Sequence, residues 1–306
     1  MPTPELILHH YWESPYAGKV RNILGFKKLA WRSVIIPMVM PKPDLTALTG
    51  GYRKTPVLQI GADVYCDTDL IARALDRVAP DPPLFPDASE AMAMLLGPWQ
   101  QELFMLAVRR VGTTVPVFPE GFVEDRAKMV EGGYSLEKIL REAPAQREQL
   151  RAKLSLLDRH LEAHGPFVLG ARPSLADFSF AHPIFPLQMF PQVAGDLEPF
   201  PHLRAWAERM AAFGQGTFTE VSSGEAVAIA RAARPLPTSG VDAGEPNGYR
   251  TGDRVSVVHE NWGMDPTVGE LVASSVHEIA LRRTDERAGE VVVHLPREHY
   301  VVTRAA

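Results

Sequence analysis

The sequence predicts an α/β segment, followed by an all-α segment and then by a small all-β segment. Strand-like and helix-like patterns of apolar residues alternate over residues 1–80, whereas apolar residues recur every three to four positions over residues 89–234. Over residues 248–306 they alternate with polar residues, as in half-buried strands. Proline-containing linkers at residues 80–88 and 235–248 separate these segments. We therefore expect one domain in each of the three ranges.

The first segment is expected to have the element order β-α-β, then a loop or short helix, then β-β-α. We expect the first strand in "ELILHH", followed by a helix that Ser14 caps and Pro15 begins. We expect a second strand in "WRSVIIP", a hairpin turning at residues 61–63 in "TPVLQIGADVYC", and a last helix in "DTDLIARALDRV". A β-α-β unit implies parallel strands and the hairpin adds antiparallel ones, so the sheet should be mixed.

The second and third segments differ in their period. The second has several stretches with apolar residues at helical spacing, which predicts roughly five or six helices. One of them begins with "SLAD", so Ser174 and Asp177 are expected to form a capping box. The third predicts four or five short strands in a small barrel or meander. Because so small a β domain would be marginally stable alone, we expect it to dock on the rest of the protein.

Composition restricts the class of protein. The 45% of hydrophobic and 23% of charged residues are typical of a soluble globular protein. A net charge of −5 without a basic run argues against a nucleic-acid partner. The single cysteine, Cys66, excludes an intramolecular disulfide, and no histidine spacing predicts a metal site. No run approaches the ~20 apolar residues of a membrane span and no signal peptide is evident, so we expect a cytoplasmic protein without a membrane partner.

Three motifs stand out in the first two segments, namely "WESPYAGKVR", "RKTPVLQIGADVYCDTDLI" and "FVLGARPSLADFSFA". In that order, they resemble the catalytic-serine loop with the first helix, the cis-proline strand with the glutathione-cradling turn, and the buried capping-box helix of the cytosolic glutathione S-transferases. Ser14, Thr55 and Asp67 lie 41 and 12 residues apart, as in the serine-type classes such as theta and tau. The resemblance covers residues 5 to about 215 and leaves out the C-terminal β segment.

This resemblance implies a thioredoxin-like α/β N-terminal domain that binds glutathione, an all-α domain that binds an electrophile, and a homodimer. The implied reaction is attack of the glutathione thiolate, from glutathione as co-substrate, on an electrophilic small molecule. The residues expected to line the electrophile pocket are Met92, Trp99, Phe104, Met105 and Arg109. Two alternatives remain open: a binding protein on this fold without turnover, and a glutathione-dependent isomerase or ether-cleaving enzyme.

Ser14 is the first candidate for a catalytic residue. A thiol attacks only as its thiolate, and an unperturbed pKa of about 8.5 leaves most of it protonated at neutral pH. At a helix start, Ser14 could offer the sulfur both a hydroxyl donor and the positive potential of the helix N-terminus. The plain alternative is that Ser14 only caps the helix. The resemblance also makes Tyr11 a competing donor, whereas Cys66 is expected to be a small buried side chain.

The second motif is expected to form the glutathione cradle. In the resembled family the proline at the position of Pro56 is cis, and the backbone of the preceding residue, here Thr55, pairs with the peptide like an added strand. Thr68 and the helix start can hold an anion and Asp67 a cation, which matches the α-carboxylate and α-ammonium of the γ-glutamyl end. The cations expected to bind the glycyl carboxylate are Lys42 and Lys54.

Overall fold

The computed structural model describes residues 4–114, 119–130, 133 and 136–305 and is built on one continuous mixed sheet. The α/β segment comprises β1 (Ile7–His10), α1 (Pro15–Phe26), β2 (Ala30–Ile35), α2 (Pro43–Thr49), β3 (Val57–Ile60), β4 (Asp63–Cys66) and α3 (Thr68–Val78). β1 pairs in parallel with β2 and antiparallel with β3, which in turn pairs antiparallel with β4. The expected mixed sheet and thioredoxin-like order are thus confirmed.

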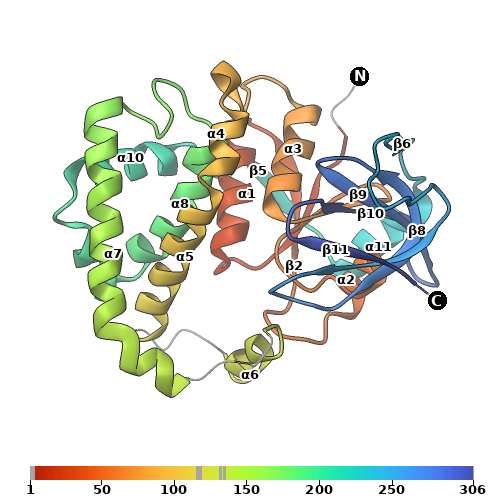
Figure 1. The fold of residues 1–306 in the computed structure, drawn as a ribbon, viewed down its shortest axis with the longest axis horizontal. Helices are drawn as coiled ribbons and strands as arrows, with labels where there is room; N and C mark the ends of the chain where they lie inside the picture. The colour runs from red at the N-terminus through yellow and green to blue at the C-terminus, as the bar shows by residue number, and fades with distance from the viewer. Residues whose placement is uncertain (1–3, 115–118, 131–132, 134–135, 306) are drawn as a thin grey trace.

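The helical segment packs against the α/β segment along α1 and α3 (Figure 1). It comprises α4 (Glu90–Leu95), α5 (Gly97–Gly112), α6 (Phe122–Ala127), α7 (Leu136–His164), α8 (Leu175–Met189), α9 (Pro191–Ala194) and α10 (Pro201–Ala212). One buried core joins both segments and includes Leu24, Leu75, Leu103, Phe178 and Trp206. Within the described ranges, no helix has the length and apolar character of a membrane span.

The expected capping box is present at the start of α8, between Ser174 and Asp177. The Asp177 carboxylate also accepts hydrogen bonds from the backbone N–H of Val168 (2.7 Å) and the indole N–H of Trp206 (2.9 Å). This buried carboxylate therefore holds the start of α8 to α10 as well as capping its own helix.

The last part of the expected helical range differs from the prediction. β5 (Thr217–Glu220) pairs in parallel with β2, and α11 (Ser223–Ala232) packs against α2. Gly214 and Gly216 precede β5 with φ of 68° and 72°, which favour glycine. A Cβ on Gly216 would lie 2.5 Å from a backbone oxygen. These glycines let the chain turn back onto the α/β sheet, and helical periodicity does not register such a turn.

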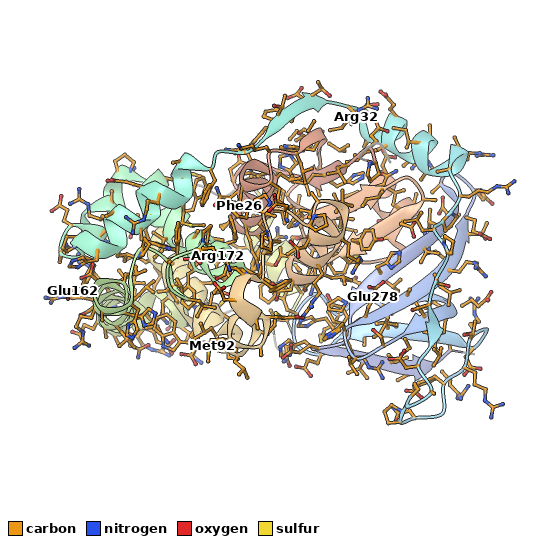
Figure 2. The ribbon with its side chains drawn as sticks, turned by 90° about the horizontal axis from the view of Figure 1, so that it is seen from above. Phe26, Arg32, Met92, Glu162, Arg172 and Glu278 are labelled. Carbon is orange, nitrogen blue, oxygen red and sulfur yellow. The ribbon has the colours of Figure 1, made fainter. Side chains whose placement is uncertain are left out.

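The C-terminal segment continues the same sheet. It comprises β6 (Gly240–Val241), β7 (Arg254–His259), β8 (Thr267–Ser274), β9 (Glu278–Asp285), β10 (Gly289–Pro296) and β11 (Tyr300–Arg304). β7 to β10 form an antiparallel meander, β11 lies beside β7, and β10 pairs in parallel with β4. The expected docking is confirmed, and it takes the form of strand pairing. Figures 1 and 2 show α7 and these strands on opposite sides of the α/β segment, with Glu162 of α7 and Glu278 of β9 marking the two sides in Figure 2.

A buried histidine joins β4, β9 and β10. The His294 ring nitrogens lie 2.9 Å from Oδ1 of Asp63 and 2.5 Å from Oε1 of Glu278, and the ring stacks on Tyr65. Burial alone would lower the pKa of His294, but the hydrogen bonds with Asp63 and Glu278 outweigh burial and raise it. Burial would raise the pKa of Glu278, but the hydrogen bond with His294 outweighs burial and lowers it. The His294 ring therefore links Asp63 and Glu278 where the C-terminal segment meets β4.

We expect the free energy of unfolding to fall as the pH rises through the folded-state pKa of His294. Because this pKa is raised, its stabilising contribution is complete below the unfolded-state value of about 6.5 and is lost above the folded-state value. Thermal unfolding between pH 6 and pH 9 should show a larger loss in the wild type than in His294→Gln. The same pH dependence in both proteins would contradict this role.

A chain truncated after Arg234 is expected to lose its compact state. A second core cluster contains Val34 and Val64 of the α/β segment together with Leu271 and Val293 of the C-terminal segment. Truncation would expose this apolar surface and leave the edge of β4 unpaired, which favours aggregation. Increased binding of a hydrophobic dye and a lower melting temperature than the full chain are the expected results. A soluble truncated chain that melts like the full chain would refute them.

Candidate functional site

The three chain segments with the candidate site residues meet at the same end of neighbouring strands. β1 ends at His10, β3 begins at Val57 and β4 ends at Cys66. His9 lies opposite Val57, and Val57 lies opposite Cys66, so these strand ends are neighbours. The loop to α1, the segment 55–56 and the start of α3 therefore leave the sheet side by side.

Ser14 lies at the N-terminus of α1 and is 3% exposed. Its Oγ accepts a hydrogen bond from the backbone N–H of Ala17 (3.2 Å), so the expected cap is present. Because the cap uses a lone pair of the oxygen, the hydroxyl hydrogen remains available for a second partner. Ser14 can therefore cap the helix and donate a hydrogen bond at its positive end at the same time.

Lys19, which the sequence analysis did not single out, links α1 to the start of α3. Its Nζ donates to Oγ1 of Thr68 (3.4 Å) and to Oδ1 of Asp69 (2.6 Å). The Lys19 side chain is 3% exposed and that of Asp69 is 41% exposed, so the ion pair is shielded from water on the lysine side only. The contact holds the helix start of the cradle next to the helix that Ser14 caps.

Arg21, also missed from the sequence, fixes the loop that carries Ser14. Its guanidinium donates to the backbone oxygens of Tyr11 (3.4 Å) and Trp12 (3.0 Å) and to Nδ1 of His10 (3.1 Å). Arg21 is 1% exposed. The sequence offered one sign of this buried arginine, because its position falls among the apolar residues that face the core on this helix.

The Thr55–Pro56 peptide bond is cis, as the resemblance implied. Thr55 precedes β3, so the residue pairs of β3 with β1 and β4 do not include it. Lys42 Nζ donates to the backbone oxygen of Arg53 (3.2 Å) and to Oγ1 of Thr55 (3.4 Å). Burial, followed by the charge of Arg126, lowers the pKa of Lys42 to about 8, so the ammonium beside Thr55 is still charged at neutral pH.

Asp67 starts α3 with a φ of 76°, which is uncommon for a residue other than glycine. Its Oδ1 accepts a hydrogen bond from the backbone N–H of Asp69 (3.4 Å), while Oδ2 lies 3.8 Å from Nζ of Lys54. The two lysines that we expected at one carboxylate thus face different parts of the cradle, because Lys54 faces Asp67 and Lys42 faces Thr55.

Comparisons with known families and structures identify this combination of fold and motifs. The N-terminal domain of glutathione S-transferases matches residues 8–83, and their C-terminal domain matches residues 131–209. The solved structure of a GST-like protein from Pseudomonas syringae is 40% identical over 99% of this chain and 100% of that chain, with a TM-score of 0.77. The chain belongs to the glutathione S-transferase family.

More distant glutathione S-transferases share the fold. One from Methylobacillus flagellatus, solved with glutathione bound, is 21% identical over 68% of this chain and 95% of that chain, with a TM-score of 0.52. A tau-class enzyme from mango is 18% identical over 68% and 89%, also with a TM-score of 0.52. The alignment with the Pseudomonas protein, in contrast, includes the C-terminal strands. No curated protein sequence matches the chain.

The side chains expected to line an electrophile pocket differ in their surroundings. Phe104 packs against Tyr16 with 4.6 Å between ring centroids, and the Tyr16 hydroxyl donates to Oε1 of Gln101 (2.7 Å). Phe104 therefore faces the start of α1. Trp99 packs on Phe180 of α8 (5.4 Å), and Phe104 also contacts this helix through His182 (5.0 Å). Of the other three members, Met92 is exposed and Met105 and Arg109 are half-buried.

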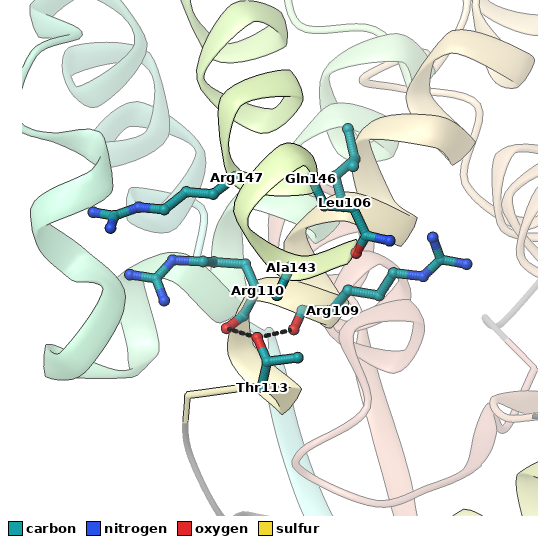
Figure 3. A pocket seen from close by; sticks show the side chains of 7 residues that line it. All are labelled: Leu106, Arg109, Arg110, Thr113, Ala143, Gln146 and Arg147. Atoms are coloured by element: carbon teal, nitrogen blue, oxygen red, sulfur yellow. Dashed lines mark hydrogen bonds between the residues drawn. The ribbon is translucent and has the colours of Figure 1, made fainter. Parts of the chain in front are cut away.

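Arg109 borders a small cavity between α5 and α7. Figure 3 shows the residues that line this cavity, which are Leu106, Arg109, Arg110, Thr113, Ala143, Gln146 and Arg147. Its volume of about 10 Å³ holds at most one water, so it is no substrate pocket. Arg110 and Arg147 bind Asp196 at 2.5 and 3.0 Å, while the Arg109 guanidinium points away from both (Figure 3).

α6 covers the side of the site that holds Arg53. Asp125 of α6 accepts hydrogen bonds from the guanidinium groups of Arg53 and Arg126 and from the backbone N–H of Met40 (3.1 Å). Arg126 in turn donates to the hydroxyl of Tyr11 (3.3 Å). The competing candidate donor, Tyr11, thus has its hydroxyl directed at α6, and the sequence pattern gave no sign of this contact.

Replacing Asp125 by alanine is expected to loosen α6. The change leaves two largely buried guanidinium groups without this carboxylate, which typically costs about 3 kcal/mol. Chemical denaturation should show the loss, and the amides of α6 should exchange faster with solvent. Asp265→Ala is the matched control, because Asp265 lies 3.7 Å from the same Arg53 but is 46% exposed, and such pairs contribute about 0–1 kcal/mol. Equal losses in the two variants would contradict the role of Asp125.

Proposed function

We propose that the protein binds glutathione at this edge of the sheet and activates its thiol for attack on an electrophilic small molecule. The observation that supports this most is the convergence of a capping hydroxyl, Ser14, with the Thr55–Pro56 segment and the start of α3 at neighbouring strand ends. A peptide lying along Thr55 would bring its central residue toward the helix start that Ser14 caps.

The cradle supplies groups for each part of the peptide. The N–H and C=O of Thr55 pair with the cysteinyl backbone in the manner of an added strand. Asp67 receives the α-ammonium of the γ-glutamyl end, and the start of α3 with Thr68 receives its α-carboxylate. Lys42 and Lys54 supply positive charge for the carboxylates of the peptide.

The chemical step uses few protein groups. The thiol loses its proton to solvent, and the resulting thiolate is stabilised by the Ser14 hydroxyl and by the N-terminus of α1. The sulfur lone pair then forms a bond to the electrophilic carbon. Either a leaving group departs with its electron pair, or an adjacent π bond accepts the electrons and takes up a proton.

Ser14 suits the sulfur better than Tyr11 does. The Ser14 hydroxyl uses only a lone pair for its cap, and it lies at the positive end of α1. The Tyr11 hydroxyl likewise only accepts a hydrogen bond, from Arg126 (3.3 Å), but this contact directs it at α6, and its ring packs against the second core cluster. Tyr11 therefore serves mainly to hold α6 against the sheet.

An ultraviolet titration of the thiolate of bound glutathione tests this function. We expect a thiol pKa below the solution value in the wild type, and a rise of about one to two units in Ser14→Ala, because a hydrogen bond to a charged group contributes about 1.5–3 kcal/mol. Tyr11→Phe, the matched control, should leave the thiol pKa within a few tenths of the wild type.

The outcomes separate the alternatives. A wild-type protein that binds glutathione but leaves its thiol pKa unchanged would overturn the transferase function and favour a binding protein. A rise in Tyr11→Phe but not in Ser14→Ala would transfer the donor role to Tyr11. Because alanine also removes the helix cap, at a cost of about 1 kcal/mol, the melting temperature of Ser14→Ala is measured alongside.

A further inference from the structure

The C-terminal β segment lies against the stretch of chain that leads into Thr55. The loop between β7 and β8 follows this stretch closely. A Cβ on Gly51 would lie 2.5 Å from the backbone oxygen of Pro266, and Oγ1 of Thr267 donates to the backbone oxygen of Thr49 (3.4 Å). The added segment is thus in direct contact with one border of the cradle.

Lys54 is enclosed by this segment. A Cβ on Gly263 would lie 3.1 Å from Cγ of Lys54, so the β7–β8 loop is packed tightly on the aliphatic stem. The ammonium lies 4.9 Å from the ring centroid of Tyr300, the first residue of β11, and 5.2 Å from that of Tyr52. The Lys54 side chain is only 14% exposed. Two aromatic faces therefore fix the position of the charge.

The two rings hold the ammonium without adding an opposite charge. An aromatic face attracts a cation through its quadrupole but carries no charge. Asp67 provides the one carboxylate found within 4 Å of Nζ among the described residues, and 3.8 Å is longer than a hydrogen bond. Burial and then the charge of Lys54 lower the pKa of nearby His259 to about 4, so that imidazole is neutral at physiological pH. The ammonium can therefore bind a further anion.

We infer that the C-terminal β segment completes the glutathione site, with Tyr300 as a positioning residue that holds the Lys54 ammonium beside Asp67 to bind a carboxylate of the peptide. This inference rests on the proposed function, because it takes glutathione as the ligand of the cradle. The side chain of Tyr300 acts through Lys54, so a ring at position 300 is required and its hydroxyl is not.

Titration calorimetry of glutathione on full-length variants tests the inference. Tyr300→Leu is expected to raise the dissociation constant for glutathione about tenfold, since the loss of a desolvated cation–π contact has roughly this effect on affinity. Tyr300→Phe keeps the aromatic face and should bind within twofold of the wild type. In the background of Lys54→Met, Tyr300→Leu should cause no further loss, because the group it positions is gone.

Tyr249→Leu is the matched control on the same segment. The Tyr249 ring is half-buried against Arg304, and its hydroxyl donates to the backbone oxygen of Val302 (2.9 Å). This variant should lose comparable packing without changing glutathione affinity. An equal loss of affinity in Tyr249→Leu would show a general effect of the segment and overturn the role of Tyr300.

The remaining outcomes distinguish this inference from the proposed function. If the wild type binds glutathione and Tyr300→Leu binds it equally well, the inference fails while the proposed function stands. Additive losses from Tyr300→Leu and Lys54→Met would also overturn it, because they would show that the two residues act separately. If the wild type does not bind glutathione at all, the proposed function fails and the inference fails with it.

Discussion

The parallel pairing of β10 with β4 is the interaction on which the rest of the architecture depends. β4 would otherwise be an edge strand, with its N–H and C=O groups unpaired and its apolar side chains half covered. β10 supplies the hydrogen bonds and, with β8 and α11, the other half of the second core cluster. The same pairing brings Asp63 and His294 together. The C-terminal segment is therefore a continuation of the α/β domain in structural terms, although it is the last part of the chain.

Much of this fold could be predicted because its signals are local. Ser14 followed by Pro15 marks a helix start, and Ser174 with Asp177 marks another, since a cap depends on residues three positions apart. The pairing of β4 with β10 could not be predicted in this way. It joins residues more than 220 positions apart, and each strand has the same side chains whichever strand it pairs with. β5 was missed because four residues between a glycine-rich turn and the start of α11 carry too little periodicity.

The residues of the candidate site also divide into those that the sequence could predict and those that it could not. Thr55, Pro56, Asp67 and Thr68 could be proposed from the sequence because the motif that resembles the glutathione S-transferases is contiguous there. The surroundings of Lys54 could not be named, because they come from the far end of the chain. Lys19 and Arg21 were missed for another reason. A buried cation in a helix is explained only by the oxygens it reaches, and these belong to α3 and to the loop before α1.

The long separation of β4 from its partner also has a consequence for synthesis of the protein. The last residue of β4 is Cys66 and the first of β10 is Gly289, so 223 further residues must be added (289 − 66) before pairing can begin. At 5–20 residues per second, this takes about 10 to 45 seconds. During that interval the nascent chain presents an unpaired, apolar strand edge, which is a template for association with other chains. The final pairing closes a large loop, so it is also expected to be among the slower steps of folding.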